Sequence, residues 1–152
     1  MVTSDYDHLL PIELAAAQER ARLAAQWPVA AVVSKAIDPT REGVRSVATE
    51  LRRQWRLLAV FTDPPSSQYR YPTWQFREDG QPISELHDIL TVMREKGPFI
   101  TDDQGRSTGW GEVEWFMTRH VLLDGATPEE MLRTDPAAVL RAALVEFDGD
   151  EE

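Results

Sequence analysis

The sequence contains no cysteine and only three histidines, and these shortages remove several kinds of chemistry. Without cysteine, the chain can form neither a disulfide, nor a thiolate nucleophile, nor a zinc site with Cys ligands. His8, His87 and His120 lie far apart in the sequence. Glu85 and His87 are two residues apart on a predicted helix, so their side chains point to different faces and make a poor metal pair. We therefore expect no catalytic residues, no cofactor and no metal, and we do not expect an enzyme.

The chain also lacks a long apolar run. No stretch approaches the roughly 18 apolar residues of a membrane-spanning helix. The first ten residues contain neither the basic region nor the apolar core of a signal peptide. We therefore expect no membrane association and a cytoplasmic location.

Positive charge is scarce, because the formal net charge is −10. Phosphate binding depends on Lys and Arg, so this balance argues against a protein that only coats nucleic acid. The charges are also unevenly spread. Arginines gather in the middle of the chain, at Arg41, Arg45, Arg52, Arg53 and Arg56. Acidic residues end it, at Glu146, Asp148, Asp150, Glu151 and Glu152. Such asymmetry indicates either two surfaces with different partners or solvated faces with no specific role.

Helix-forming sequence is plentiful. Apolar residues at helical spacing predict helices over residues 11–27, 40–55 and 83–96, the third capped by Ser84 or a neighbour. A further helix begins at Asp135–Pro136. Residues 29–35 fit a helix or a strand equally well. The fold class expected is mainly α: a helical bundle with one small β-hairpin.

One β-hairpin interrupts the helices. Residues 57–61 are apolar, residues 62–68 (TDPPSSQ) cannot be helical, and residues 69–71 alternate aromatic and charged side chains before Pro72. Tyr69 and Tyr71 are expected on one face of the returning strand, with Arg70 on the other.

The stretch from Gly109 to Leu132 is the densest in large apolar residues. Trp110, Trp115 and Phe116 predict a helix with a broad buried face, followed by an apolar turn over residues 121–123. Thr127-Pro-Glu-Glu130 then predicts a helix that begins with a capping box. Two tryptophans five residues apart cannot share a narrow stripe, so either both are core residues or one belongs to a partner surface.

Three segments together resemble a known family. RLLAVFTDPPSSQYRYPTWQF from Arg56, DGQPISELHDIL from Asp79 and GEVEWFMTRHVLLDGATPEEMLRTDPAAVLRAA from Gly111 are similar to antitoxins of the Xre/MbcA/ParS-like type, as a divergent member. That resemblance covers about two-thirds of the chain. It implies a degenerate helix-turn-helix-like part with the hairpin over residues 1–78 and a helical toxin-binding module over residues 79–152.

The resemblance implies an antitoxin that neutralises a cognate protein toxin by direct binding, with a RES-type toxin that consumes NAD as the suspected partner. It also implies repression of its own promoter, so operator DNA is a second expected partner. Asp38–Pro39 occupy the expected turn of the helix-turn-helix, so toxin binding is favoured over DNA binding. The alternative is a winged-helix transcriptional regulator whose C-terminal module only dimerises.

Two sets of residues are predicted to carry these interactions. DNA would contact a basic face formed by Arg45, Arg52, Arg53, Arg56 and Arg70. The toxin would contact Trp110, Trp115, Phe116, Leu123, Phe147, Asp148, Asp150, Glu151 and Glu152. The apolar C-terminal half is also expected to form a homodimer or higher oligomer.

The acidic tail has two interpretations. Asp148 to Glu152 would enter the basic NAD pocket of the toxin as a phosphate mimic, with Phe147 as anchor. Alternatively, the tail is solvated and only aids solubility.

Overall fold

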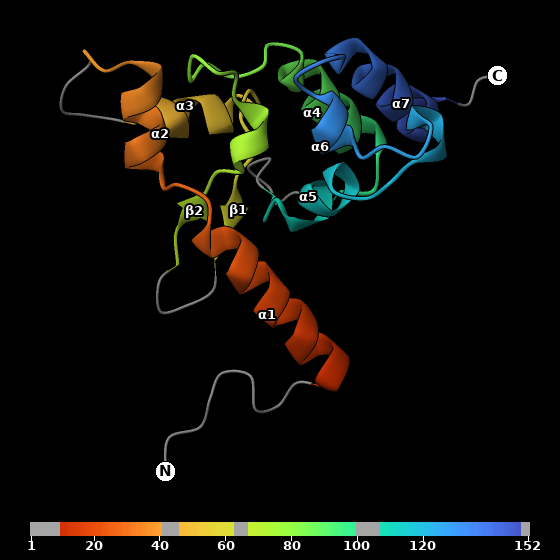
Figure 1. Ribbon diagram of the computed structural model, residues 1–152, viewed down its shortest axis with the longest axis horizontal. Helices are drawn as coiled ribbons and strands as arrows, with labels where there is room; N and C mark the ends of the chain where they lie inside the picture. Colours follow the sequence, from red (N-terminus) through yellow and green to blue (C-terminus); the bar gives the residue numbers. More distant parts are fainter. Residues whose placement is uncertain (1–9, 41–45, 63–66, 100–106, 150–152) are drawn as a thin grey trace.

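The computed structural model describes residues 10–40, 46–62, 67–99 and 107–149. Within these ranges the chain is mainly helical with one small antiparallel hairpin, which confirms the predicted fold class (Figure 1). The elements in order are α1 Pro11–Ala25, α2 Ala30–Ile37, α3 Val47–Arg53, β1 Val60–Phe61, β2 Tyr69–Arg70, η1 Thr73–Gln75, α4 Leu86–Lys96, α5 Trp110–Phe116, η2 Val121–Leu123, α6 Pro128–Met131 and α7 Pro136–Asp148. The two η elements are single 3₁₀ turns.

In the N-terminal half, three helices are followed by the hairpin. The hairpin pairs Val60 with Arg70 and Phe61 with Tyr69. On the other side of β2, Val29 forms a bridge with Arg70, and the Tyr71 N–H donates to the Pro28 carbonyl at 2.9 Å. The order is therefore α1, the isolated bridge residue Val29, α2, α3 and the hairpin. The segment 29–35, ambiguous in the sequence, divides into this bridge and the start of α2.

Helix α3 is shorter than predicted. The expected helix from Thr40 was wrong at its start, because Thr40 lies in a turn and Ser46 caps the helix instead; residues 41–45 lie outside the described ranges. The Ser46 hydroxyl accepts a hydrogen bond from the Thr49 N–H at 3.1 Å and contacts the Ser34 hydroxyl at 2.8 Å. This hydroxyl pair fixes α3 against α2, because Ser34 also accepts from the Ala48 N–H.

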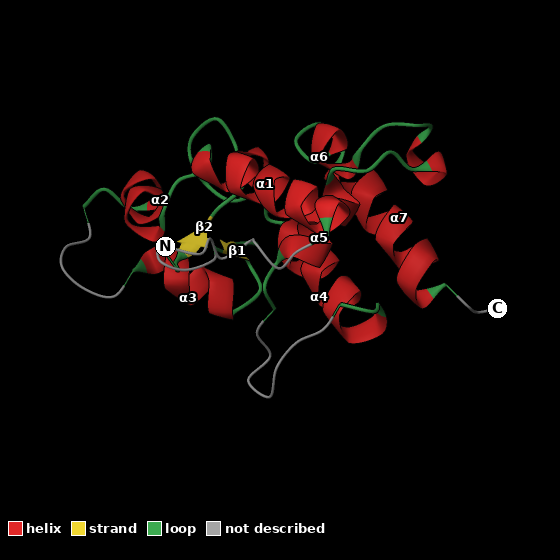
Figure 2. Cartoon of the chain, turned by 90° about the horizontal axis from the view of Figure 1, so that it is seen from below, coloured by secondary structure: helices red, strands yellow, loops and turns green. Residues whose placement is uncertain are grey.

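In the C-terminal half, α4 packs along α7, and α5 lies beside them in both views (Figures 1 and 2). The predicted capping box of α6 is confirmed. Thr127 Oγ1 accepts from the Glu130 N–H at 3.3 Å, and Glu130 Oε1 accepts from the Thr127 N–H at 3.0 Å. Ser84 does not cap α4, which begins at Leu86, because its hydroxyl donates to the Glu85 carboxylate.

A chain of aromatic rings forms the centre of the main core. Trp27 lies edge-on to Trp74 at 6.5 Å between ring centroids, and Trp74 lies 5.0 Å from Phe116. Phe116 contacts Trp115 at 5.2 Å, and Trp115 contacts Phe147 at 5.8 Å. We call these five residues the aromatic spine. It joins the end of α1 to α7, so one core spans the expected boundary between residues 78 and 79.

A fully buried amide connects the strand region to the spine. Gln75 Oε1 accepts from the Leu58 N–H at 2.7 Å, and its Nε2 donates to the carbonyls of Leu58 at 2.7 Å and Pro72 at 2.9 Å. The Gln75 side chain therefore pairs with both backbone groups of Leu58, as a neighbouring β-strand would.

Replacing Gln75 by Leu should keep the buried volume but leave three buried backbone groups unpaired. We expect the free energy of unfolding to fall by about 2–5 kcal/mol. Urea denaturation measures this loss. The same change at the exposed Gln54 should stay within about 0.5 kcal/mol. Equal effects at the two positions would show that the Gln75 hydrogen bonds are not important for stability.

Candidate partner-binding surface

The two halves of the chain differ strongly in charge. Residues 1–78 contain ten Lys and Arg against nine Asp and Glu, for a net charge of +1. Residues 79–152 contain six Lys and Arg against seventeen Asp and Glu, for a net charge of −11. A partner attracted to the C-terminal half by charge must therefore be cationic.

A turn in this acidic half exposes two apolar side chains. Val121 is 92% exposed and Leu122 is 49% exposed, whereas Leu123 is buried. The turn is closed by three backbone hydrogen bonds: from the His120 N–H to Ala126, from the Gly125 N–H to His120 and from the Ala126 N–H to Leu123, at 2.9–3.1 Å. Asp124 adopts the left-handed conformation, with φ of 57°. The two side chains are thus held toward solvent in a defined geometry, which is typical of an interaction surface.

The base of this turn is tied to the end of α7. His120 Nε2 donates to the Trp115 carbonyl at 3.0 Å, and Trp115 Nε1 donates to Glu146 Oε1 at 2.9 Å. His120 Nδ1 lies 3.8 Å from the same Glu146 oxygen. The exposed turn and the start of the acidic tail therefore lie at the same end of the molecule.

The last turn of α7 is anchored in the core. The Phe147 ring packs edge-on against Phe99, 5.3 Å away between centroids, as well as against Trp115. Asp148 is exposed, with Oδ1 3.9 Å from Lys96 Nζ. The other predicted tail contacts, Asp150, Glu151 and Glu152, lie outside the described residues.

Three predicted partner contacts are core residues. Trp115, Phe116 and Leu123 are buried, so their assignment to an exposed partner surface was wrong. Trp115 and Phe116 belong to the aromatic spine, and Leu123 fixes the turn to the same core. Trp110 is half-buried: its ring stacks on Trp27 at 6.3 Å, and its Nε1 donates to the Phe61 carbonyl at 3.2 Å.

Sequence reasoning selected Leu123 for the partner surface and left Val121 and Leu122 out. A signal for them was present in the sequence. Three consecutive apolar residues before Asp124–Gly125 cannot all face the core in so short a turn, so some must face solvent.

The predicted basic face is only partly exposed. The Arg52 guanidinium lies 3.7 Å over the Tyr69 ring, and Arg70 Nη1 donates to the Trp27 carbonyl at 2.8 Å. These two arginines stabilise the hairpin and its contact with α1. Arg53 and Arg56 are exposed at the end of α3, and Arg45 lies outside the described residues.

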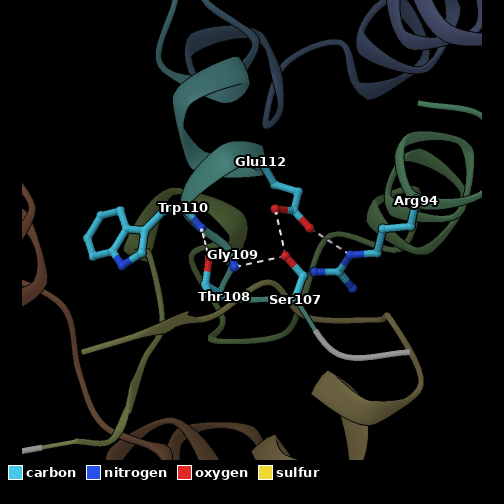
Figure 3. Close-up of polar contacts among 6 residues, drawn as sticks. All are labelled: Arg94, Ser107, Thr108, Gly109, Trp110 and Glu112. Carbon is cyan, nitrogen blue, oxygen red and sulfur yellow. Dashed lines mark hydrogen bonds and ion pairs between the residues drawn. The ribbon is translucent and has the colours of Figure 1, made fainter. Parts of the chain in front are cut away.

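A buried ion pair connects α4 to α5 (Figure 3). Arg94 Nε donates to Glu112 Oε2 at 2.8 Å, and these side chains are 6% and 1% exposed. Ser107 Oγ donates to the other Glu112 oxygen at 3.0 Å and accepts from the Gly109 N–H at 3.0 Å. Both carboxylate oxygens thus have partners, so we assign this cluster to the fold.

Gly109 makes the approach of α5 to the hairpin region possible. Its φ is +84°, and a Cβ at this position would lie 1.9 Å from the Ala59 carbonyl oxygen. A side chain would therefore be excluded both by backbone conformation and by space.

The two glutamates in the first turn of α6, Glu129 and Glu130, have pKa values shifted in opposite directions. Burial, together with the nearby Glu130 charge, raises the pKa of Glu129. The hydrogen bond from the Thr127 N–H is the main factor that lowers the pKa of Glu130. A cation placed against Glu129 would stabilise its ionised form. The negative net charge of this half would attract such a cation.

Among the residues that the structure describes, no group of three or more His, Asp or Glu is placed to hold a metal ion. No helix in the described ranges is both long enough and apolar enough to span a membrane. Comparisons with protein-family models, curated proteins and solved structures find no match to this chain.

Breaking the buried ion pair between Arg94 and Glu112 should destabilise the folded protein. Arg94→Met leaves the Glu112 carboxylate buried without its cation and should lower the free energy of unfolding by about 3–5 kcal/mol. The double variant Arg94→Met/Glu112→Gln should recover part of that loss, because no buried charge remains. Chemical denaturation at neutral pH measures both.

The exposed pair between Glu19 and Arg22, 2.6 Å apart with side chains 54% and 58% exposed, provides the control. Arg22→Met should lower the free energy of unfolding much less than Arg94→Met does, because water screens an exposed pair. If Arg94→Met costs no more than Arg22→Met, the buried pair does not stabilise the fold as described.

Proposed function

We propose that this protein is an antitoxin that neutralises a cognate toxin by direct contact through its acidic C-terminal half. The main supporting observation is the turn that exposes Val121 and Leu122 beside the end of α7. An exposed apolar turn in the half of the chain that carries a net charge of −11 suits a partner with an apolar groove bordered by Lys or Arg.

A RES-type toxin has the chemistry that such a surface requires. An enzyme that binds NAD must hold a pyrophosphate, and Arg or Lys side chains commonly do so. The tail begins at the anchored Phe147, next to the base of the turn. In this proposal the turn binds beside the toxin pocket, and the carboxylates from Asp148 onward bind its basic groups.

Val121→Asp/Leu122→Asp should abolish this apolar contact while leaving the fold intact, because both side chains are exposed. We expect affinity for the toxin to fall by at least about tenfold, or about 1.4 kcal/mol. Titration calorimetry with the purified toxin measures affinity, and growth of cells that co-express the two proteins measures protection.

Val32→Asp is a matched control, since Val32 is 58% exposed on α2 in the other half of the chain. It should leave both affinity and protection unchanged. Full protection by the Val121→Asp/Leu122→Asp variant would contradict the proposal. Equal losses in the two variants would also contradict it, since the effect would then not be specific to the turn.

A second candidate, a winged-helix regulator of transcription, is favoured by the element order of the N-terminal half. The bridge from Val29, just before α2, to Arg70 places an extended residue beside the hairpin, which would act as the wing. The exposed Arg53 and Arg56 would contact phosphates from the end of α3. An antitoxin that represses its own promoter would combine the two functions.

DNA binding is tested with the upstream region of the protein's own gene. If Arg53 and Arg56 contact phosphates, Arg53→Gln and Arg56→Gln should each reduce the log–log salt slope by about 0.9. Arg141→Gln in the C-terminal half should leave it unchanged. Absence of binding at about 50 mM salt, with or without the toxin, would exclude this second candidate.

A further inference from the structure

Helix α1 projects from the rest of the molecule (Figure 1). Eleven of its fifteen residues are exposed, and Ala24 is its one buried residue. Among the described residues, the contacts that hold α1 lie in its C-terminal half: Leu23 packs against the core, and the Arg20 guanidinium lies 5.8 Å from the centroid of the Trp110 ring. In proteins most helical stability comes from tertiary packing, so a helix with so few contacts among the described residues would be stabilised by a further partner.

One row of apolar residues runs along α1 from its N-cap, and we call this row the seam. Successive residues of the seam are alternately four and three positions apart, which is the heptad pattern of helices that pair. They are Leu10, Leu14, Ala17, Ala21 and Ala24. Ala24 is buried on the body, while Leu14 and Ala17 are half-buried and Leu10 is 62% exposed. Toward its free end, the seam therefore still offers apolar surface to a partner.

We propose that the partner is α1 of a second copy of this chain, packed antiparallel. In this register Leu10 packs against Ala21 of the second copy, and Leu14 packs against Ala17 of the second copy. Two-fold symmetry repeats both contacts in the opposite direction. Each large side chain then faces a small one, so the seam is filled evenly along its length.

The charges beside the seam favour the same arrangement. Glu13 and Arg20 are seven residues apart, so they occupy the same heptad position on one side of the seam. Antiparallel packing brings Glu13 next to Arg20 of the second copy, twice per dimer. Parallel packing would place these charges next to Gln18 and Ala25 instead. The contact with Trp110 uses the face of the Arg20 guanidinium and leaves N–H groups for a carboxylate.

This dimer is independent of the proposed toxin contact. Figure 1 shows α1 extending away from α4, α5, α6 and α7, so self-association through α1 leaves the C-terminal surface accessible. It differs from the dimer expected through the apolar C-terminal half, where Leu144 and Val145 are exposed on α7.

A charge-swap experiment on the full chain tests this inference. Sedimentation equilibrium at tens of micromolar, without toxin or DNA, should show a dimer for the natural sequence. Glu13→Arg and Arg20→Glu should each weaken it by about tenfold or more, because each places like charges together. The double variant Glu13→Arg/Arg20→Glu should restore it, which a purely local role of either residue in α1 could not explain.

Glu19→Arg and Arg22→Glu, on the opposite side of α1 from the seam, are the controls and should leave the dimer unchanged. Circular dichroism establishes that each variant keeps the natural helix content. A monomeric natural sequence, single variants without effect, or a double variant that stays monomeric would overturn the inference. Dissociation by Leu144→Asp/Val145→Asp but by none of the α1 variants would also overturn it and place the dimer on α7.

Discussion

The rest of the structure depends on the packing of the aromatic spine, because these rings run without a break from one half of the chain to the other. Trp27 at the end of α1 meets Trp74 after the hairpin, and Trp74 meets Phe116 on α5. Such rings bury large apolar areas and pack best edge-on or offset, so they fix the relative orientation of the elements that carry them. Nearby, Gln75 pairs with buried backbone groups of Leu58 and Pro72, and Arg94 pairs with Glu112.

Much of the fold is predictable from the sequence because its determinants are local. Thr127 and Glu130 form a capping box from four consecutive residues, and the hairpin follows from an apolar run, a proline-containing turn and an aromatic return. The beginning of α3 is different, since it depends on a hydroxyl pair between Ser46 and Ser34, twelve residues apart. A hydrogen bond to a distant segment leaves no periodic signal in the sequence.

The candidate surface is less predictable from the sequence, because it also depends on contacts between distant segments. Composition and spacing indicate how apolar the 109–132 stretch is, but only packing decides which of its side chains face the core. Trp115 and Phe116 enter the spine, whereas Val121 and Leu122 remain exposed because the closed turn points them away. The charge division was visible in the sequence, and the structure adds that the acidic end of α7 lies beside this turn. In our proposal one end of the molecule binds the toxin, and the projecting α1 binds a second copy.

The central claim is that the toxin binds the turn and the end of α7. Hydrogen exchange of backbone amides, compared between the free protein and its complex with the toxin, tests this most directly. Amides tied into the turn, such as those of His120, Gly125 and Ala126, should exchange more slowly in the complex, as should those at the end of α7. The region around Arg53 and Arg56 should exchange at the same rate in both states. Protection confined to α3 and the hairpin, with the turn unchanged, would contradict the account.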